Sequence, residues 1–332
     1  MNILERREAF SESLLSWFLE VKEDFPWRRT TDPWAILVSE VMLQQTQVAT
    51  VIGKGFYTRF MERFPDVQSI STASEQEILK AWEGLGYYRR VRNLQKTAQA
   101  IVEHHAGVFP KDYDALLDLP GVGKYTAGAV SSFAFNKAQA LVDANVARLF
   151  SRLFNFRERV DDSRGMKQLY SWAEELLDQQ EPREYNSALM EIGQKVCRNK
   201  NPQCMLCPVR EFCATDDPET LPIKKEKKAT VLVDEHALWC RNTNGDVLMA
   251  KKAEKQRREG MWALPLRAVE EVSDCEILSK STYAITHHKV TLRVYASDEV
   301  IAREDEEWIT LEQLENAPVP SPFRRVIVGL LG

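Results

Sequence analysis

The sequence predicts two domains, an all-helical one followed by an α+β one, and three observations support this prediction. The chain of 332 residues is long enough for two hydrophobic cores. Apolar side chains recur at helical spacing from residue 5 to about 213, whereas short runs of strand character follow residue 230. Between these parts, prolines and lysines replace the apolar periodicity. We therefore predict a helical domain over residues 1–216, an exposed linker over 217–230 and an α+β domain over 231–332.

The helical domain is predicted to begin with a helix whose apolar stripe includes Phe10 and Phe18 and which stops before Pro26. Asp32 followed by Pro33 is typical of a helix N-cap and first helical position. We expect one helix to follow and to carry the stretch "WAILVSEVMLQQTQVATVI". Further helices fit residues 74–83, 89–104, 112–118, 124–134, 145–154, 163–179 and 184–197.

The α+β domain is predicted from short runs of strand character. The stretches "ATVLVDEHALWC" and "DVLMAKK" have this character, and Asn244 with Gly245 between them is a turn of the kind that closes hairpins. The stretch "TLRVYASDEVI" continues the strand pattern, and "LEQLENA" fits a brief helix.

The composition is that of an ordinary globular protein, with 44% hydrophobic and 28% charged residues. No apolar run approaches the roughly 20 residues that span a bilayer, and the charged amino terminus does not match a signal peptide. We therefore expect a cytoplasmic protein without a membrane partner. The net charge of −5 gives no global sign of a nucleic-acid partner, so any phosphate-binding surface has to be local.

The stretch "LPGVGKYTAG", residues 119–128, predicts a glycine turn between two helices. The segment before it is helical rather than a strand, and no third glycine has the spacing of a dinucleotide-binding fingerprint. Gly121 and Gly123 would let the backbone approach an anion, and the free N–H groups of the following helix would donate to it. We expect a DNA phosphate there, with a plain turn between two core helices as the alternative.

Four of the six cysteines follow the spacing C-x6-C-x2-C-x5-C. Thiolate quartets bind either a tetrahedral zinc ion or an iron–sulfur cube, and structural zinc sites usually contain two well-separated pairs. Only one close pair is present, so the spacing favours an iron–sulfur cluster over zinc. The predicted ligands are Cys197, Cys204, Cys207 and Cys213.

Glu40 and Asp143 are carboxylates with different predicted surroundings. The neighbours of Glu40 one helical turn away are mainly apolar, which favours its protonated form and suits it to be a general acid. Asp143 precedes a helix, where N–H donors and the helix dipole would hold it ionised. Such a pair is expected at a site that cleaves a glycosidic bond. The alternatives are a plain helix cap for Asp143 and a solvent-facing position for Glu40.

The stretches "SEVMLQQTQV", "GLGYYRR", "LPGVGKYTAGAV", "VDANV" and "NSALMEIG", together with the four-cysteine loop, resemble the helix-hairpin-helix DNA glycosylase superfamily. Within it, the chain is most similar to the adenine DNA glycosylases. This resemblance implies an all-α helix-hairpin-helix glycosylase domain with a [4Fe-4S] loop at residues 197–213. It also implies that residues 231–332 form an α+β, Nudix-like domain that recognises 8-oxoguanine.

The resemblance implies a monofunctional base excision repair enzyme. Its substrate would be double-stranded DNA in which adenine is mispaired with 8-oxoguanine or guanine, and it would hydrolyse the N-glycosidic bond of that adenine. A monomer is expected, associated with the nucleoid of a bacterial cytoplasm when bound to DNA. The product, an abasic site, would pass to a downstream endonuclease.

The resemblance also assigns roles to the catalytic positions. Glu40 would protonate the adenine base, and Asp143 would stabilise the oxocarbenium ion, with Asn145 as a neighbour in the pocket. Tyr125 occupies the position at which bifunctional relatives carry a lysine that attacks the sugar. A phenol cannot form the resulting imine, which predicts no strand cleavage.

Further positions are assigned to DNA. Glu191 would contact the flipped adenine, which has to leave the duplex to be reached. Gln45 and Tyr88 would press into the stack around the oxidised guanine, and Lys124 would meet a phosphate. In the Nudix-like domain, Thr286 and His287 stand where the family reads 8-oxoguanine with a Phe-Ser-His stretch, the phenylalanine being replaced by isoleucine.

Two other functions are considered beside this one. The first is a thymine or uracil mismatch DNA glycosylase of the same superfamily, some members of which also carry tyrosine at the Tyr125 position. The second is a non-catalytic DNA-binding homologue. A nucleotide pyrophosphohydrolase is disfavoured, because "LPLRAVEEVSDCEIL" supplies too few correctly spaced acidic residues for a metal-binding helix.

Overall fold

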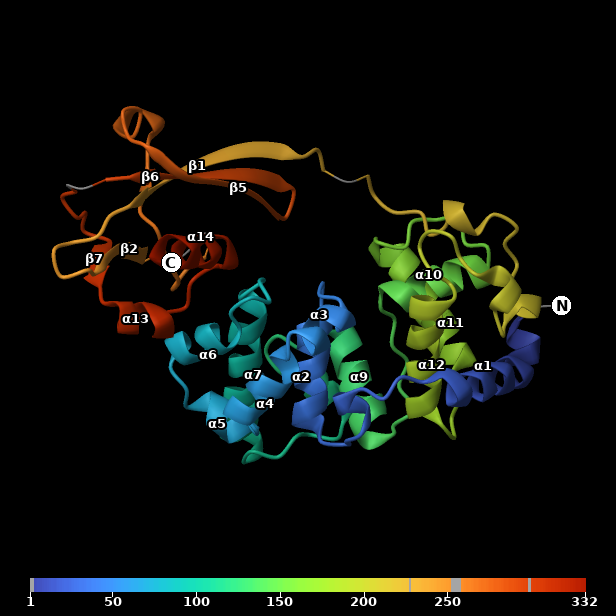
Figure 1. Ribbon diagram of the computed structural model, residues 1–332. Helices are drawn as coiled ribbons and strands as arrows, with labels where there is room; N and C mark the ends of the chain where they lie inside the picture. Colours follow the sequence, from blue (N-terminus) through green and yellow to red (C-terminus); the bar gives the residue numbers. More distant parts are fainter. Residues whose placement is uncertain (1–2, 227, 252–257, 298–299) are drawn as a thin grey trace. The chain divides into compact units, whose positions relative to one another are not determined.

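The computed structural model describes residues 3–226, 228–251, 258–297 and 300–332 (Figure 1). These residues form two compact units that interleave along the sequence. The first unit contains Met1–Gln45, Asp66–Gln68 and Lys96–Glu226, and the second contains Thr46–Pro65, Ser69–Gln95 and Lys227–Gly332. The predicted boundaries at 216 and 231 divide the chain differently, into continuous ranges, and stay a prediction. Lys227 of the predicted linker, Lys252 and residues 298–299 lie outside the described residues.

The first unit is helical, as predicted. Its core is built around Phe10, Phe18, Phe150 and Tyr185, all of them buried. The longer helices are α1 (Arg7–Val21), α2 (Pro33–Leu43), the end of α7 (Arg89–His105), α9 (Lys124–Phe135), α10 (Ala144–Leu153), α11 (Ser163–Leu176) and α12 (Pro182–Lys195). Short elements are α8 (Tyr113–Leu117) and the 3-10 turns η1 (Ile3–Arg6), η2 (Pro26–Arg28), η3 (Cys204–Leu206), η4 (Arg210–Phe212) and η5 (Pro218–Thr220).

Helix α2 begins as predicted but ends earlier. The Asp32 carboxylate accepts hydrogen bonds from the backbone N–H groups of Trp34 and Ala35, which confirms the N-cap. The prediction of one helix through residue 52 is wrong, because α2 stops at Leu43 and a new helix, α3 (Val48–Gly53), follows. Gln45 between them has a φ of 60°, a left-handed conformation that no helix contains. Neither glycine nor proline marks this break in the sequence.

The second unit combines helices with two sheets. Its helical part contains α3, α4 (Phe56–Arg63), the end of α5 (Val67–Ser71), α6 (Glu75–Ala81) and the start of α7. Gly55, with a φ of 62°, turns the chain from α3 into α4. Phe60 packs edge-on against Trp82, and both are fully buried.

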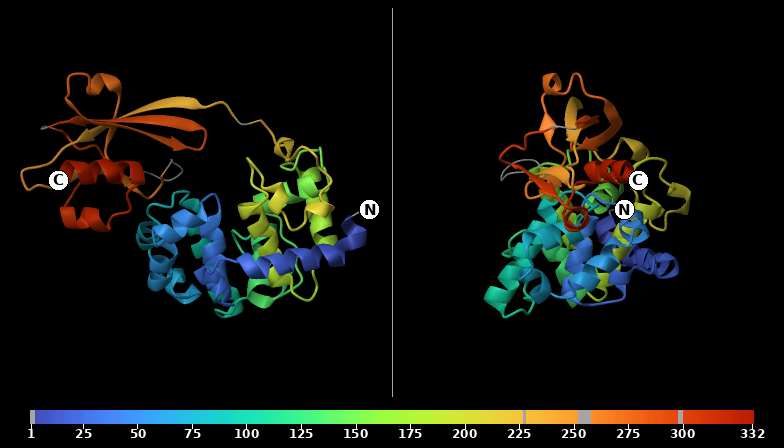
Figure 2. Two further views of the ribbon diagram at one scale, coloured as in Figure 1. Left: turned by 45° about the vertical axis from the view of Figure 1, so that its right-hand side comes forward. Right: turned by 60° about the vertical axis from the view of Figure 1, so that its left-hand side comes forward.

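The strands of the second unit form one four-stranded and one three-stranded sheet. The orders are β4-β1-β6-β5 and β3-β2-β7, and β1 runs parallel to β6 with Val231 opposite His288. Figures 1 and 2 show α14 beside the four-stranded sheet, and its Phe323 is fully buried in the core. The strands are β1 (Val231–Trp239), β2 (Val247–Lys251), β3 (Trp262–Ala263), β4 (Leu266–Arg267), β5 (Ile277–Ile285), β6 (His288–Ala296) and β7 (Glu306–Ile309), and the remaining elements are η6 (Val269–Glu271), α13 (Leu311–Asn316) and α14 (Ser321–Leu331).

The predicted turn at Asn244 and Gly245 forms, but it does not close a regular hairpin. Gly245 has a φ of 86°, and Arg241 and Val247 make an isolated antiparallel bridge beside the turn. The strands on either side then separate, because β1 joins the four-stranded sheet and β2 the three-stranded one. A turn signal fixes the local backbone only, whereas the sheet that each strand joins depends on distant partners.

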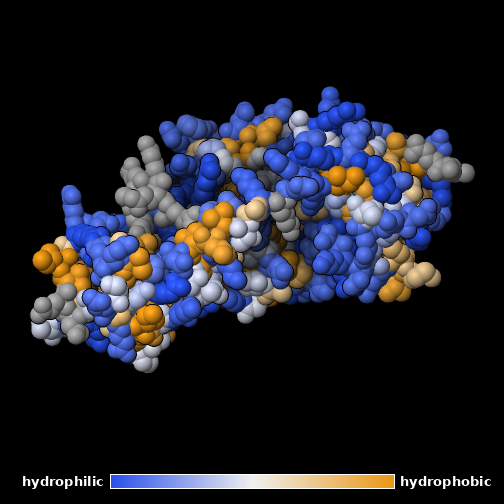
Figure 3. Space-filling model, turned by 90° about the horizontal axis from the view of Figure 1, so that it is seen from above, coloured by the Kyte–Doolittle hydropathy of each residue, from blue (hydrophilic) through white to orange (hydrophobic). Residues whose placement is uncertain are grey.

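The surface seen in Figure 3 is mainly hydrophilic, with hydrophobic residues in separate small groups, as is usual for a water-exposed face. No helix in the described ranges is both long and apolar enough to cross a membrane.

Candidate active site

Glu40 and Tyr125 meet at the contact between α2 and α9. Glu40 lies near the carboxyl end of α2 with 5% of its surface exposed, so the predicted burial is confirmed and the solvent-facing alternative is excluded. Tyr125 is the second residue of α9, and its hydroxyl donates a hydrogen bond to Oε2 of Glu40 over 2.6 Å. The short distance is typical of a hydroxyl bound to a carboxylate.

Burial controls the protonation of this pair. The pKa of Glu40 is raised to about 7. Desolvation by burial is the main cause and the nearby charge of Asp143 adds to it, while the hydrogen bond from Tyr125 lowers the pKa. Burial and the Glu40 carboxylate also raise the pKa of Tyr125 well above its ordinary value. At neutral pH the phenol therefore keeps its proton, and Glu40 is close to half protonated.

Asp143 caps α10 and lies close to this pair. Its Oδ1 accepts hydrogen bonds from the backbone N–H groups of Asn145 and Val146, at 2.8 and 2.7 Å. Its Oδ2 accepts a third from Nδ2 of Asn145, at 2.8 Å. The predicted cap is thus confirmed. The expectation that the surroundings of Asp143 favour its charged form is wrong in direction: burial raises its pKa, and the hydrogen bonds only partly oppose this effect.

Asn145 is oriented by a buried arginine. Nη2 of Arg148 donates to Oδ1 of Asn145 over 2.8 Å, so the amide N–H group of Asn145 is left to face Asp143. The same guanidinium donates to the backbone oxygens of Gly193 and Cys197, each at 2.7 Å. A side chain at Gly193 would place its Cβ 2.6 Å from Cβ of Asn145, so only glycine lets α12 approach α10 here. The carboxylate cap is therefore rigidly connected to the start of the cysteine loop.

Glu191 is fully buried on α12 and forms ion pairs with two cations. Nη2 of Arg28 is 2.7 Å from its Oε2, and Nζ of Lys195 is 2.9 Å from its Oε1. Lys195 is also 2.9 Å from Oε1 of Glu23. Arg28 contributes to the electrostatic field at Glu40 as well. The sequence prediction had not included Arg28, whose position directly after "PW" was the only available signal.

The predicted helix-hairpin-helix is present between α8 and α9. Gly121 has a φ of 82°, which favours glycine, and Gly123 is the N-cap of α9 without a side-chain cap. Lys124 does not extend freely from this turn: its Nζ lies 3.7 Å from Oε1 of Glu174 and 3.7 Å from the centre of the Tyr170 ring. Its side chain remains 48% exposed.

Seven exposed non-glycine residues in the described chain have a left-handed backbone, which such residues rarely adopt. Gln45, Tyr87 and Thr286 are among them, with φ values of 60°, 49° and 54°, and the others are Ala106, Asn136, Asn155 and Asn201. Backbone strain of this kind gathers at functional sites. Gln45 and Thr286 were predicted to contact DNA, whereas Tyr87 was not. Tyr88, which was predicted to contact DNA, is half-buried. Burial raises the pKa of its hydroxyl to about 12, and this hydroxyl bonds to the backbone of Gly84. Its role at DNA stays a prediction.

Thr286 and His287 line one pocket on the second unit, next to the end of β5. The hydroxyl of Thr286 donates to its neighbouring backbone oxygen at Ile285, over 2.6 Å. The His287 ring lies 4.2 Å from that of His288. The pocket lining contains Thr230, Thr282, Tyr283, Ala284, Thr286, His287, His288 and Lys289.

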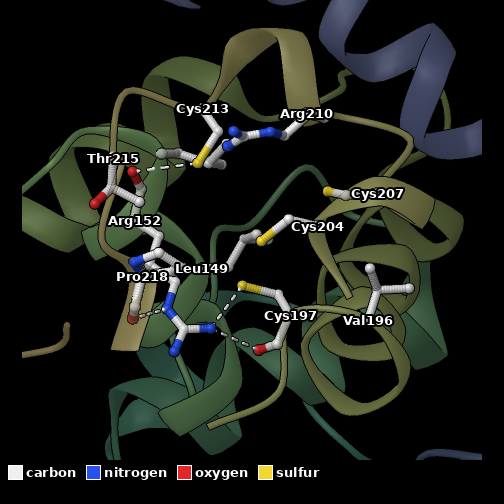
Figure 4. A pocket seen from close by; sticks show the side chains of 11 residues that line it. Leu149, Arg152, Val196, Cys197, Cys204, Cys207, Arg210, Cys213, Thr215 and Pro218 are labelled. Carbon is white, nitrogen blue, oxygen red and sulfur yellow. Dashed lines mark hydrogen bonds between the residues drawn. The ribbon is translucent and has the colours of Figure 1, made fainter. Parts of the chain in front are cut away.

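The four predicted cysteine ligands line one pocket of the first unit (Figure 4). Nη1 of the buried Arg152 donates to Sγ of Cys197 over 3.2 Å, and Arg210 lines the same pocket. In the parts of the chain that the structure describes, no three His, Cys, Asp or Glu side chains form a group that could hold a metal ion. Four soft donors spread around one space, with cations that offset negative charge, fit a larger iron–sulfur group.

Two known families match the chain in order. Residues 38–175 match the HhH-GPD superfamily of base excision DNA repair proteins, and residues 236–328 match the NUDIX domain. Among solved structures, that of a thermostable thymine-DNA glycosylase is 32% identical, with a TM-score of 0.58, and the similarity covers 63% of this chain and 96% of that one. The chain therefore belongs to the HhH-GPD superfamily of base excision DNA repair proteins.

Within this superfamily, the chain is similar to proteins named adenine DNA glycosylase. The human protein is 44% identical over 214 residues, which are 62% of this chain and 39% of the human one. The protein of Buchnera aphidicola subsp. Acyrthosiphon pisum is 26% identical over 340 residues, which cover 96% of each chain. The chain spans about two fifths of the length of the mammalian relatives that it matches.

We predict that Glu40→Gln changes how the free energy of unfolding depends on pH. The folded-state pKa of Glu40 is about 7 and its ordinary value is 4.5, so the native chain binds a proton that the unfolded chain has released. The stability from this proton is complete below about pH 4.5 and is lost as pH rises through about 7. Relative to Glu40→Gln, the wild type should lose on the order of 3 kcal/mol in urea unfolding between about pH 5 and 8. Parallel pH profiles for the two proteins would contradict the assigned pKa.

Proposed function

We propose that the chain is an adenine DNA glycosylase of base excision repair. It hydrolyses the N-glycosidic bond of adenine mispaired with 8-oxoguanine or guanine in double-stranded DNA. The observation that carries this proposal is the buried Glu40, with a pKa of about 7, held by Tyr125 close to the capped Asp143. The relatives named adenine DNA glycosylase support the choice of base.

Glu40 acts as the general acid. A catalytic acid is most effective when its pKa lies near the working pH, because it is then protonated and still a strong donor. Burial is the main cause of this property of Glu40, and the charge of Asp143 adds to it. Proton transfer to the adenine ring makes the base a better leaving group and leaves positive charge on the sugar.

Asp143 stabilises that positive charge. Its carboxylate is fixed by three N–H donors, so it faces the developing cation without having to reorganise. Asn145 sets the direction of one of these bonds and is itself held by Arg148. Two carboxyl groups thus divide the work, one giving a proton and the other balancing charge, as in other glycosidic cleavage.

Tyr125 makes the reaction hydrolytic. Strand cleavage through an imine needs an amine at the sugar, and a phenol cannot supply one. The nearest lysine along the chain, Lys124, is paired with Glu174 and lies against Tyr170. The product is therefore an abasic site, which a separate endonuclease processes.

Glu191 and its two cations recognise the extruded base. The target bond cannot be reached inside a duplex, so adenine has to leave the stack. A carboxylate held by Arg28 and Lys195 accepts hydrogen bonds from an exocyclic amino group, which adenine has and thymine lacks. The free N–H groups at Gly121 and Gly123, together with Lys124, meet the DNA phosphates.

Gln45 and the turn that carries Tyr87 and Tyr88 enter the stack. Tyr88 is the residue that the resemblance assigns to this contact, and Tyr87 beside it is the more exposed of the two. Thr286 and His287, in the pocket beside β5, read the oxidised guanine. The enzyme acts as a monomer on DNA of the nucleoid.

Cys197, Cys204, Cys207 and Cys213 hold a [4Fe-4S] cluster. When bound, the cluster shapes the loop at 197–213 and contributes no step to the hydrolysis. Arg148 donates hydrogen bonds both to Asn145 and to the backbone oxygen of Cys197, so a change in the conformation of this loop would shift Asn145 and the Asp143 cap.

A thymine mismatch glycosylase is the second candidate, favoured by the 32% identity to a thymine-DNA glycosylase. The similarity to that protein covers only 63% of this chain. This chain also matches the NUDIX domain at residues 236–328. The higher identity to the human adenine enzyme, 44%, and the carboxylate at Glu191 favour adenine.

Single-turnover cleavage of labelled duplexes tests the activity. The duplexes carry adenine opposite 8-oxoguanine, adenine opposite guanine, or thymine opposite guanine, and each is analysed before and after alkali. We expect product only after alkali, fastest with 8-oxoguanine, and a rate at least ~100-fold lower for Glu40→Gln because the general acid is lost. Cleavage without alkali would refute the role of Tyr125, and activity confined to the thymine duplex would establish the second candidate.

Metal and sulfide analysis tests the cofactor. Chain purified without oxygen should contain about four iron and four sulfide per protein. Cys204→Ser should lose most of both, because a hydroxyl is a poor ligand for iron in such a cluster. Cys275→Ser is the matched control and should keep them, since Cys275 lies in another unit. One zinc ion per chain, without sulfide, would contradict the assignment.

A further inference from the structure

Glu83 and Arg324 form an ion pair inside the second unit. Nε and Nη2 of Arg324 donate to the two carboxylate oxygens of Glu83, at 2.7 and 3.1 Å. Both side chains are mostly covered, with 16% of Glu83 and 20% of Arg324 exposed. Such a two-pronged contact fixes orientation as well as distance. Glu83 directly precedes the "GLGYY" turn after α6, and Arg324 lies on α14.

The surrounding backbone completes the pair. Arg324 also donates to the carbonyl oxygens of Leu314 and Ala317, at 2.9 and 2.7 Å, and so closes the chain between α13 and α14. The backbone N–H of Val319 donates to Glu83 over 3.4 Å, and Lys80 approaches the same carboxylate at 3.3 Å. All three nitrogen atoms of the Arg324 guanidinium therefore donate hydrogen bonds, and both carboxylate oxygens of Glu83 accept them.

One end of the pair leads to the exposed Tyr87. Three residues separate Tyr87 from Glu83, and two of them, Gly84 and Gly86, have positive φ. Tyr88, the next residue, is half-buried. Its hydroxyl bonds to the backbone of Gly84, and Glu83 and Arg324 are close enough to shift its pKa. The turn is thus anchored on the same charges that form the pair.

The other end leads to the pocket with Thr286 and His287. Phe323, next to Arg324, lies 5.0 Å under the guanidinium of Arg258, which is also 5.3 Å from the ring of Tyr283. The Tyr283 hydroxyl donates to Glu235 over 2.5 Å, which ties β5 to β1. Tyr283 lines the pocket and precedes Thr286 by three residues on the same strand end.

We propose that Glu83 and Arg324 are a positioning pair that fixes the 8-oxoguanine-reading pocket relative to the Tyr87 turn and thereby sets the preference for 8-oxoguanine over guanine opposite adenine. This inference rests on the proposed function and adds two residues that touch neither the base nor Glu40. When the pair is intact, contacts to the oxidised base and insertion of Tyr87 act on one DNA geometry. Without it, each part still folds, but the contacts to 8-oxoguanine no longer help to reach the transition state.

Single-turnover rates on adenine:8-oxoguanine and adenine:guanine duplexes test the pair. For Arg324→Ala and Glu83→Gln we expect the ratio of these two rates to fall by about tenfold, the size expected for one lost charge-assisted contact. The rate on adenine:guanine should stay within about twofold of wild type, since the catalytic residues are unchanged. Arg324→Lys keeps the positive charge but cannot contact both carboxylate oxygens of Glu83 with two nitrogens, so it should give an intermediate ratio of the two rates.

The double variant and a matched control separate positioning from general damage. Because the two residues act through one contact, Glu83→Gln with Arg324→Ala should be no worse than either alone. Arg325→Ala removes the neighbouring exposed arginine of α14 and should keep the wild-type ratio. Melting curves confirm that each variant is folded.

The outcomes distinguish the inference from the function on which it rests. A wild type without any preference for 8-oxoguanine would refute the proposed reading function itself. A wild type with the preference, together with variants that keep it, would overturn the positioning role. Variants that lose both rates equally would overturn it too, because that result indicates a general effect on folding or DNA binding.

Discussion

The hydrogen bond between Tyr125 and Glu40 is the interaction on which the site depends. A carboxyl group buried between two helices has to stay protonated or find a strong donor, because its charge is poorly solvated there. Tyr125 supplies that donor from the first turn of α9, and its own pKa is raised so far that it remains a donor at neutral pH. The balance between burial and this bond leaves Glu40 able to give a proton near pH 7. The same residue choice removes the amine that strand cleavage would need.

The other charged groups of the site are held in place by hydrogen bonds and ion pairs. Asp143 is held by the first N–H groups of α10, and Arg148 connects Asn145 with the backbone of Cys197. The ion pairs with Arg28 and Lys195 offset the desolvation of the buried Glu191 carboxylate. A site assembled from paired and capped groups keeps its geometry while a base enters and leaves, which glycosidic cleavage requires.

Sequence patterns predicted those parts of the structure that depend on neighbours along the chain. Helical periodicity, the Asp32 cap, the Asp143 cap and the glycine turn are local signals, and the structure confirms them. The break at Gln45 had no local signal, since neither glycine nor proline marks it. The pairing of Arg28 with Glu191 and the separation of β1 from β2 depend on contacts between residues far apart in the sequence. Which of the adjacent Tyr87 and Tyr88 is the more exposed depends on the backbone conformation of the turn, which the sequence did not reveal.

The pH dependence of single-turnover cleavage in the wild type and in Tyr125→Phe tests the central claim most directly. The account predicts that the wild-type rate falls as pH rises through about 7, where Glu40 loses its proton. Since the Tyr125 bond lowers the pKa of Glu40, its removal should move this fall to higher pH, while strand cleavage remains absent. A fall at unchanged or lower pH in Tyr125→Phe would contradict the account.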